Sequence, residues 1–436
     1  MTNRSAEQVE FPACRGRRVE AEFSGGAVSS EGGVLLLRQV DRRLGLLKTV
    51  ARAVPDDRDP DRVVHSQLSM VRQRVYGIAL GWEDLNDHAG LRGDPALQTA
   101  VERDEALASA PTLCRLEHRA GRQAALDIHR VLIEQFIASF AEPPEELILD
   151  FDATDDPVHG RQEGRFFHGY YDLYCFLPLY VFCGEQLLCA YLRPANRDAA
   201  RHAWAILSLV VKRLREAWPE VKIVLRGDSG FCRWKMLRWC ERRGVDYIVG
   251  LAKNDVLKRL AADAMAQAAE EHVRTGEKAR CFTELDYAAK TWDKPRRVIA
   301  RIEHDARGAN PRFIVTNLPG EAKGLYEQVY CARGEMENRI KEQLQLFSDR
   351  TSCHAWWPNQ FRVLLSALAY VLVESLRRLA LHGTELARAQ VATIRLKLLK
   401  IGAVILRNSR RVRFLLSSAH PAQDLFRLVA SRLAPS

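Results

Sequence analysis

The segment from residue 145 to residue 251 most constrains the fold, because short apolar runs alternate there with amphipathic stretches. The apolar runs predict strands at 147–153, 175–183, 187–193, 221–226 and 246–251. The amphipathic stretches predict helices at 198–217 and 232–243. Three strands in succession, followed by helix, strand, helix and strand, indicate an α/β fold: a mixed sheet with helices on its faces.

Pro, Gly and changes of pattern divide the rest of the chain. Helical patterns at 65–81 and 105–140 end before Pro143-Pro144, which predicts a mainly helical N-terminal domain over 1–143. The sheet-forming region covers 144–251, and three alternating stretches inside 252–325 predict a small antiparallel, β-rich insertion. The core resumes over 326–385 with an apolar helix at 358–381, and a basic tail follows over 386–436.

The charge of the chain favours a polyanionic partner. Its 436 residues include 65 Lys and Arg against 55 Asp and Glu, a net charge of +10. Arginine is well suited to phosphate, because its planar fork binds two acceptors. Charged residues interrupt the longest apolar stretch, so we expect no membrane span. Ten cysteines without a CxxC pair, and a polar N-terminus, lead us to expect reduced thiols and a cytoplasmic location.

Acidic residues end two of the predicted strands. Asp152 follows the run from Leu147, and Asp228 follows the run from Ile223. Neighbouring strands lie about 4.8 Å apart, so these carboxylates can converge, and converging carboxylates suggest Mg²⁺ or Mn²⁺ between them. Asp150 lies on the same side of its strand as Asp152, and chemistry alone does not choose between them. Asp228 is also placed to cap the following helix.

A third acidic residue lies on a predicted helix around 330–341. Tyr330, Arg333, Glu337 and Lys341 follow at spacings of three, four and four, so they share one face. Glu337 can act there as a metal ligand, with the other three side chains contacting a phosphate. The alternative is a solvated ladder of Arg, Glu and Lys.

Several motifs together carry a resemblance to a known family. The chain resembles the DDE transposases of bacterial insertion sequences and, more narrowly, insertion sequence group thirteen-eighty. The motifs are Asp152-Ala153-Thr154, Arg226-Gly227-Asp228-Ser229-Gly230-Phe231, Tyr330-x2-Arg333-x3-Glu337, Ser29-Ser30-Glu31-Gly32-Gly33, and stretches at 80–87, 159–164, 349–352 and 359–362. The similarity runs from about residue 20 to the C-terminus.

The resemblance implies a fold and a catalytic triad. Family members have a ribonuclease-H-like core, which matches the predicted order of elements, and the triad maps onto Asp152, Asp228 and Glu337, with two Mg²⁺ ions as cofactors. The related cut-and-paste branch carries a β-rich insertion between the second acid and the glutamate. The family's later lysine is expected at the position of Leu344, and Lys341 is the nearest substitute.

One tryptophan of the insertion has two interpretations. Related transposases stack an aromatic residue of the insertion on a flipped base, and Trp292 lies among basic strands in this chain. The alternative is an ordinary core tryptophan.

The expected function is that of a transposase. We expect binding to the terminal inverted repeats through the N-terminal domain, cleavage of double-stranded DNA at the element ends, and joining of the 3′-OH ends to target DNA. A homodimer on paired ends, in a bacterial cytoplasm near the nucleoid, is the expected assembly. A catalytically inactive repressor and a metal-dependent nuclease without strand transfer are the alternatives.

Overall fold

The computed structural model describes residues 9–198 and 200–434, which form two compact units. The first unit comprises residues 9–120, 345–347 and 368–434, and the second comprises residues 121–344 and 348–367. The last boundary between the units, after Ala367, falls inside one helix, α14 (Trp356–Leu376). Each unit is described by itself below.

An eight-stranded sheet is the centre of the second unit. Its strand order is β12-β13-β14-β11-β10-β4-β8-β9. The strands are β4 (Glu146–Ala153), β8 (Leu179–Cys183), β9 (Gln186–Tyr191), β10 (Lys222–Gly227), β11 (Asp246–Leu251), β12 (Ala279–Tyr287), β13 (Arg296–Asp305) and β14 (Gly308–Thr316). The strands β4, β10 and β11 run parallel, and every other neighbouring pair is antiparallel. The expected mixed sheet is confirmed.

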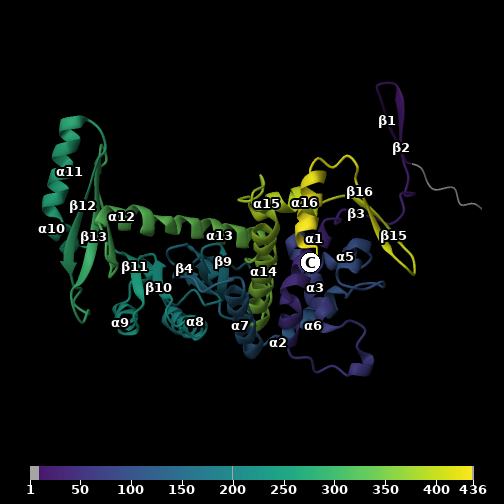
Figure 1. Cartoon of the computed structure of the whole chain (residues 1–436), viewed down its shortest axis with the longest axis horizontal. Coiled ribbons are helices and arrows are strands. Elements are labelled where there is room, and N and C mark those ends of the chain that lie inside the picture. The colour runs from purple at the N-terminus through teal and green to yellow at the C-terminus, as the bar shows by residue number, and fades with distance from the viewer. Residues whose placement is uncertain (1–8, 199, 435–436) are drawn as a thin grey trace, which may run out of the picture. The chain divides into compact units, whose positions relative to one another are not determined.

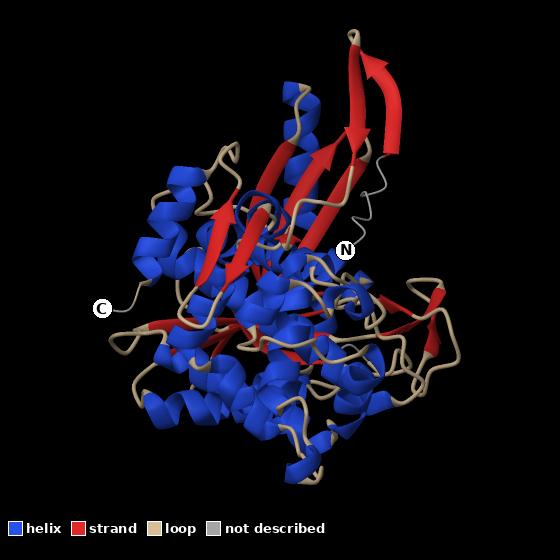
Figure 2. Cartoon of the chain, turned by 90° about the vertical axis from the view of Figure 1, so that its right-hand side faces the viewer, coloured by secondary structure: helices blue, strands red, loops and turns tan. Residues whose placement is uncertain are grey.

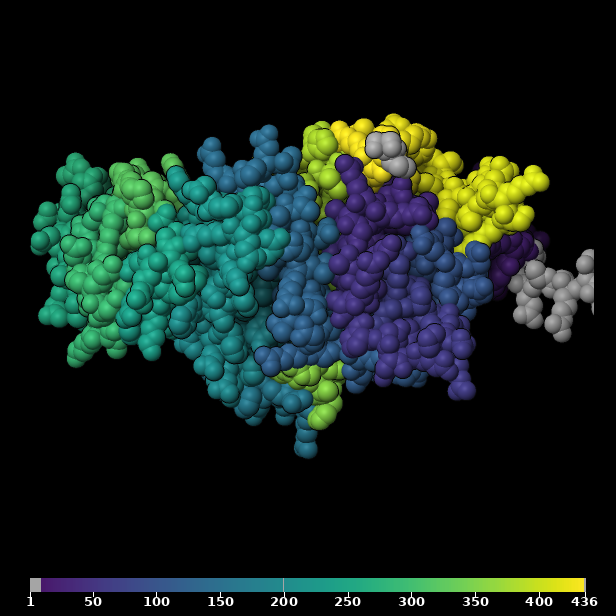
Figure 3. All heavy atoms as spheres, turned by 60° about the horizontal axis from the view of Figure 1, so that its bottom comes forward, coloured from purple at the N-terminus to yellow at the C-terminus, as the bar shows by residue number. Residues whose placement is uncertain are grey.

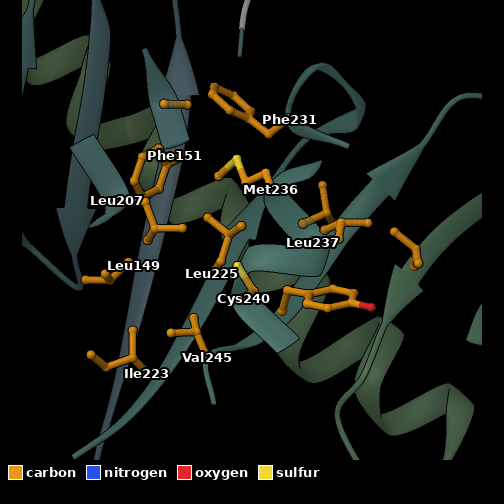
Figure 4. Packing of buried hydrophobic residues seen from close by; sticks show 14 of the residues in the cluster. Leu149, Phe151, Leu207, Ile223, Leu225, Phe231, Met236, Leu237, Cys240 and Val245 are labelled. Carbon is orange, nitrogen blue, oxygen red and sulfur yellow. The ribbon is translucent and has the colours of Figure 1, made fainter. Parts of the chain in front are cut away.

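Each face of this sheet packs against its own helices, because successive side chains of a strand point to opposite sides. On one face, Leu149, Leu225 and Val249 pack with α8 (Ala203–Ala217) and α9 (Trp234–Arg243). Figure 4 shows Leu207 of α8 and Met236 of α9 among these strand residues. Figure 3 brings forward the side on which α8 and α9 lie in Figure 1, and the teal atoms of this part of the chain form the surface there. We call it the helical face.

The other face carries the acidic residues and is called the acidic face. There Val224, Ile248, Ile299 and Ile314 pack under α12 (Ala322–Gly324) and the segment that follows it. Asp150, Asp152 and Arg226 alternate with residues of the helical face, so they belong to this side. Figure 1 shows α12 and α13 on one side of the sheet and α8 and α9 on the other.

One predicted strand is divided in the structure. Residues 175–183 form the end of β7 (Leu173–Phe176) and all of β8, separated at Leu177-Pro178. Proline has no N–H for a sheet ladder, so it ends the strand. The Leu177 N–H donates instead to the Arg193 carbonyl at 2.8 Å, and Arg193 Nε donates to the Leu177 carbonyl at 2.9 Å. The strand β7 joins β5 (Asp156–Pro157) and β6 (Phe166–His168) in a separate small sheet.

The predicted insertion is present, but its strands do not form a separate antiparallel unit. β14 pairs antiparallel with β11, from Ile248 opposite Thr316 to Leu251 opposite Phe313. The strands β12 to β14 therefore extend the large sheet at the free edge of β11, where unpaired backbone groups accept another strand. Two helices precede these strands, α10 (Asp255–Leu260) and α11 (Ala262–Thr275), and α11 packs on the helical face through Ala268.

The compact units divide earlier than the predicted boundary at Pro143-Pro144. The N-terminal stretch of the first unit ends after Ala120, and α7 (Arg122–Ala138) belongs to the second unit with the sheet. The reason is packing, because Ile133 and Phe136 of α7 are part of the hydrophobic core on the helical face.

The first unit contains helices and short strands, and Figure 2 draws the helices of the chain in blue and its strands in red. The helices that lie wholly within this unit are α1 (Val34–Leu44), α2 (Leu46–Ala53), α3 (Gln67–Leu80), α4 (His88–Leu91), α5 (Pro95–Ala100), α6 (Ala110–Arg119), α15 (Val391–Ile394) and α16 (Gln423–Leu433), with short irregular turns at Pro60–Arg62, Arg377–Leu381 and Arg395–Leu399. A hairpin of β1 (Val9–Cys14) and β2 (Arg17–Ala21) is exposed along its length. The strands β3 (Val28–Ser29), β15 (Ala403–Arg407) and β16 (Val412–Leu416) form a three-stranded sheet.

The motif Ser29-Ser30-Glu31-Gly32-Gly33 has a structural role in this unit. Glu31 is buried and accepts from Lys400 Nζ at 2.6 Å and from Trp82 Nε1 at 3.3 Å. The Gly32 and Gly33 N–H groups donate to the carbonyls of Ile401 and Leu399 at 2.9 and 3.1 Å. The motif thus joins the start of α1 to residues 398–401.

In the part of the chain that the structure describes, no helix is both long enough and apolar enough to span a membrane. All ten cysteines lie in that part, and none forms a disulfide.

Candidate active site

Asp152 and Asp228 come from adjacent parallel strands of the sheet. β4 and β10 pair in register, and Gly227, the last residue of β10, is opposite Phe151. Asp152, the second-last residue of β4, therefore lies beside Asp228, at the same edge of the sheet. Asp228 Oδ1 also accepts from the Gly230 N–H at 2.8 Å, so it caps the short helix Ser229–Phe231 while its second oxygen remains available.

Asp150 is excluded from this pair by its own partner. It is opposite Arg226 in the β4–β10 register, and the guanidinium binds its carboxylate through two contacts of 2.5 and 2.7 Å. Arg226 Nη1 also donates to the Val329 carbonyl at 2.6 Å. Through Arg226, Asp150 thus anchors the segment that carries Tyr330 and Arg333. Asp152 remains the candidate catalytic acid of this strand.

The segment that carries Tyr330, Arg333 and Glu337 changes helix type twice. A π-helix spans Leu325–Tyr330, a 3-10 turn spans Cys331–Arg333, and α13 spans Gly334–Gln345. Such irregular turns are frequent at functional sites. The predicted continuous helix is therefore irregular at its start, although Arg333 and Glu337 still meet one turn apart.

Arg333 connects two of the acids. Its Nη1 donates to Asp152 Oδ2 at 3.0 Å, and its Nη2 donates to Glu337 Oε1 at 3.2 Å. Asp152 and Arg333 are largely buried, whereas about half of the Glu337 side chain is exposed. Residues 152 and 337, far apart in sequence, therefore meet around one guanidinium.

The pKa of Asp152 shows that the third acid, Asp228, also acts on this site. Burial raises this pKa to about 6, Arg333 lowers it, and the charges of Asp228 and Glu337 raise it. Burial opposes the charge on Arg333, but the charges of Asp152, Tyr330, Asp228 and Glu337 raise its pKa overall. The three carboxylates thus act on one another electrostatically, with Arg333 offsetting part of their repulsion.

A glycine of the neighbouring strand, Gly250, leaves space for Tyr330 beside Asp228. A Cβ at Gly250 would lie 2.7 Å from the Tyr330 hydroxyl oxygen and 2.8 Å from the Ser229 nitrogen. Burial is the main cause that raises the pKa of Tyr330, and the charge of Asp228 raises it further. Sequence reasoning did not single out Gly250, although a glycine inside a strand pattern signals a close approach.

The remaining predicted DNA-contact residues lie in two places. Lys341 is exposed on α13, one turn after Glu337, and Leu344 at the expected lysine position is also exposed. Trp292 lies in the β12–β13 loop and packs on the helical face, with its ring 5.5 Å from Tyr287 and 5.4 Å from the Arg296 guanidinium. Arg296 is bound by Glu241, which also accepts from Tyr247 at the start of β11. Trp292 is therefore at the sheet edge opposite Asp228.

The donor atoms suit a hard divalent cation, because all three acids offer carboxylate oxygens and no His or Cys joins them. Asp152 and Glu337 are both engaged by Arg333, as described above. Over residues 9–198 and 200–434, no three His, Cys, Asp or Glu side chains are arranged closely enough to hold a metal ion. The donor chemistry thus fits Mg²⁺ or Mn²⁺, with Arg333 bound to two of the three donors.

Comparison with protein families identifies the class of protein. The family described as transposase DDE domain group 1 matches residues 11–436, so the chain belongs to this family of transposases. The comparison with curated proteins finds no match. Among solved structures, the chain is similar to a piggyBac transposase in a synaptic complex with hairpin DNA, at a TM-score of 0.42 and 10% identity, over 85% of this chain and 80% of that one.

Proposed function

We propose that this DDE transposase is the enzyme of a bacterial insertion sequence resembling group thirteen-eighty. In this proposal it binds the terminal inverted repeats, cleaves the DNA at the element ends and transfers the 3′-OH ends to target DNA. It acts as a homodimer on paired ends, in the cytoplasm with the nucleoid. The observation that carries the proposal is the meeting of Asp152 and Glu337 around Arg333, with the charge of Asp228 acting on the same site.

The strand order supports a ribonuclease-H-like core. Numbering β4, β8, β9, β10 and β11 from one to five, the order across the sheet is 3-2-1-4-5. The second strand is antiparallel to both the first and the third, and the fourth and fifth run parallel to the first. This arrangement matches the element order expected for that fold and brings the first and fourth strands, with their aspartates, together.

The side chains divide the proposed chemistry among them. Asp152, Asp228 and Glu337 provide oxygen ligands for two Mg²⁺ ions, or Mn²⁺. Bound there, the ions would supply activation of water and stabilisation of the leaving 3′ oxygen. Arg333 positions Asp152 and Glu337, and a guanidinium has further N–H groups that would serve as donors to a phosphate oxygen. Tyr330 is placed to donate from its hydroxyl next to Asp228.

The test is cleavage of a labelled duplex that carries the flanking inverted repeat, with Mg²⁺ and with EDTA. We expect Asp228→Asn and Glu337→Gln to lower cleavage by roughly three orders of magnitude or more, while repeat binding is retained. The matched control is Asp246→Asn, because Asp246 lies at the opposite edge of the same sheet and pairs with Asn317.

Each alternative function has its own outcome in this assay. Tight repeat binding without cutting under any metal would favour a repressor. Cutting without joining to a target duplex would favour a nuclease. Full cleavage by Asp228→Asn would reject the assigned site.

A further inference from the structure

A second charged surface lies on the acidic face, on the strands that extend the sheet. We call it the basic patch and define it by Lys278, Arg280, Arg301 and Arg312. Arg301 and Arg312 alternate with Ile302 and Phe313 along β13 and β14, and Ile302 and Phe313 belong to the helical-face core. The two arginines therefore point to the same side of the sheet as Asp152 and Asp228.

The patch carries more positive charge than its neighbours balance. Lys278, Arg280 and Arg301 all contact the single carboxylate of Glu303, at 3.0, 2.8 and 3.2 Å. Arg280 has one further partner, Glu327, at 3.0 Å. Among the residues that the structure describes, the four cations thus have two carboxylates between them.

Two of these arginines face each other directly. Arg301 is the cross-strand partner of Arg312, and like charges in that position destabilise a sheet unless an anion joins them. Arg312 is exposed, and the structure over its described residues pairs it with no carboxylate. The Arg301 Nε atom is buried and has no hydrogen-bond partner there. Arg312 thus has donors available for an added anion, beside an Arg301 charge that Glu303 balances only in part.

A row of aromatic rings connects the basic patch to the candidate active site. The Arg301 guanidinium lies 5.2 Å from the Tyr326 ring, and the Tyr326 ring lies 5.5 Å from that of Tyr330. Phe282, opposite Arg301 on β12, also contacts Tyr326 at 5.7 Å. At about 4.8 Å per strand, β13 is roughly 15 Å from β10, which ends at Gly227, directly before Asp228. DNA advances 3.4 Å per nucleotide along its axis, so this distance corresponds to a few nucleotides.

We infer that the basic patch binds the phosphate backbone of the DNA duplex whose scissile phosphate lies at Asp152, Asp228 and Glu337. The inference rests on the proposed function, because it names the part of the protein that holds the same substrate. Arg301 and Arg312 contact backbone phosphates a few nucleotides from the cut. The contact is independent of base sequence and increases affinity through charge.

The experiment measures duplex binding by fluorescence anisotropy over a series of salt concentrations. For Arg312→Gln we expect the slope of log K against log salt to fall in magnitude by about 1, because one phosphate contact is lost. The loss should be equal for repeat and unrelated duplexes. This change corresponds to about tenfold weaker binding at 0.1 M salt if the affinities converge at 1 M.

Two further variants make the result specific to this surface. Arg312→Lys keeps the charge and should keep the slope. Arg242→Gln removes an exposed cation from α9 on the helical face, and it should leave binding unchanged. Because Arg312 is exposed and faces another cation, its substitution should leave the melting temperature unchanged or slightly raised, so lost binding is not lost folding.

The outcomes separate this inference from the proposed function. Wild-type slopes in Arg312→Gln and in the Arg301→Gln/Arg312→Gln double variant would overturn the inference alone, provided that Asp228→Asn still binds but does not cut. An equal loss in Arg242→Gln would also overturn it, because any surface charge would then suffice. A wild-type protein that binds no duplex would overturn the inference and the proposed function together.

Discussion

At the scale of single residues, two aspartates on one strand differ in their partners. Asp150 is almost fully buried and bound by Arg226; burial raises its pKa, and the Arg226 cation offsets only part of that rise. Asp152 is two residues further along the strand, and its raised pKa shows that its ionised form is disfavoured in the folded protein. Both carboxylates thus cost stability when they are ionised, and for Asp150 the bound Arg226 cation offsets part of that cost.

The first prediction compares these two aspartates. Asp150→Asn should destabilise the protein by about 3 kcal/mol or more, because it leaves the buried Arg226 cation without its counter-ion. Asp152→Asn should be neutral or stabilising at pH 7, because it removes a disfavoured charge. Urea denaturation of both variants measures the difference, and an equal loss in the two would contradict the distinct roles.

A second prediction concerns the buried Asp156. Thr351 Oγ1 donates to its Oδ2 at 2.8 Å, and its Oδ1 has no partner among the described residues. Burial raises the pKa of Asp156 to about 8 from 3.8, so the folded state holds this proton more tightly than the unfolded state does. The associated stability is complete below pH 3.8 and is lost as the pH rises towards 8, by at most about 1.4 kcal/mol per pH unit.

The variant Asp156→Asn tests this pH dependence. It should be more stable than the wild type at pH 9, because it carries no charge to bury, and the advantage should shrink towards pH 4. Thermal melts across this range measure the effect. A constant difference between the two proteins at all pH values would mean that Asp156 does not titrate as described.

At the scale of elements, the close approach of another backbone segment explains two glycines, Gly32 and Gly33, that no turn requires. Gly33 precedes α1 with an ordinary negative φ, so its backbone alone would allow a side chain. A Cβ there would overlap the backbone oxygen of Leu398, and a Cβ at Gly32 would lie 2.8 Å from the Ile401 oxygen. The glycines are needed because another segment packs directly on them.

The matching prediction is a pair of alanine substitutions. Gly33→Ala should destabilise the protein by about 1–3 kcal/mol or more. The new Cβ would overlap the backbone oxygen of Leu398, which moves only together with the chain around it. The control Gly90→Ala is in α4, where a Cβ meets nothing within 4 Å, and should be neutral or slightly stabilising. Equal melting temperatures for the two variants would argue against the close approach.

At the scale of the whole molecule, one sheet carries both the candidate active site and the basic patch. The insertion extends this sheet from β11, so the strands that follow Asp228 in sequence return beside it in space. The acidic face then presents carboxylates on β4 and β10 and arginines on β13 and β14. A single surface of the second unit thus combines the groups for cutting with groups suited to holding a polyanion.

Local patterns in the sequence predicted much of this arrangement. Apolar runs defined the strands β4, β9, β10 and β11, and Asp152 and Asp228 were identified because they end two of them. The Arg333–Glu337 contact followed from a spacing of one helical turn. These features depend on neighbours within a few residues, so the chain itself specifies them.

The family resemblance had already selected Asp152 over Asp150. Only the tertiary structure showed that Arg226 binds Asp150 and that Trp292 lies at the sheet edge away from the acids. A signal existed for the first, since Leu147-Ile148-Leu149-Asp150 and Ile223-Val224-Leu225-Arg226 place opposite charges at the same offset of two strands. That signal has meaning only once the strands are known to pair in parallel and in register. The position of Trp292 likewise depended on β14 pairing with the edge of β11. Such pairings join residues far apart in sequence through backbone groups that every residue carries, so side-chain patterns do not specify them.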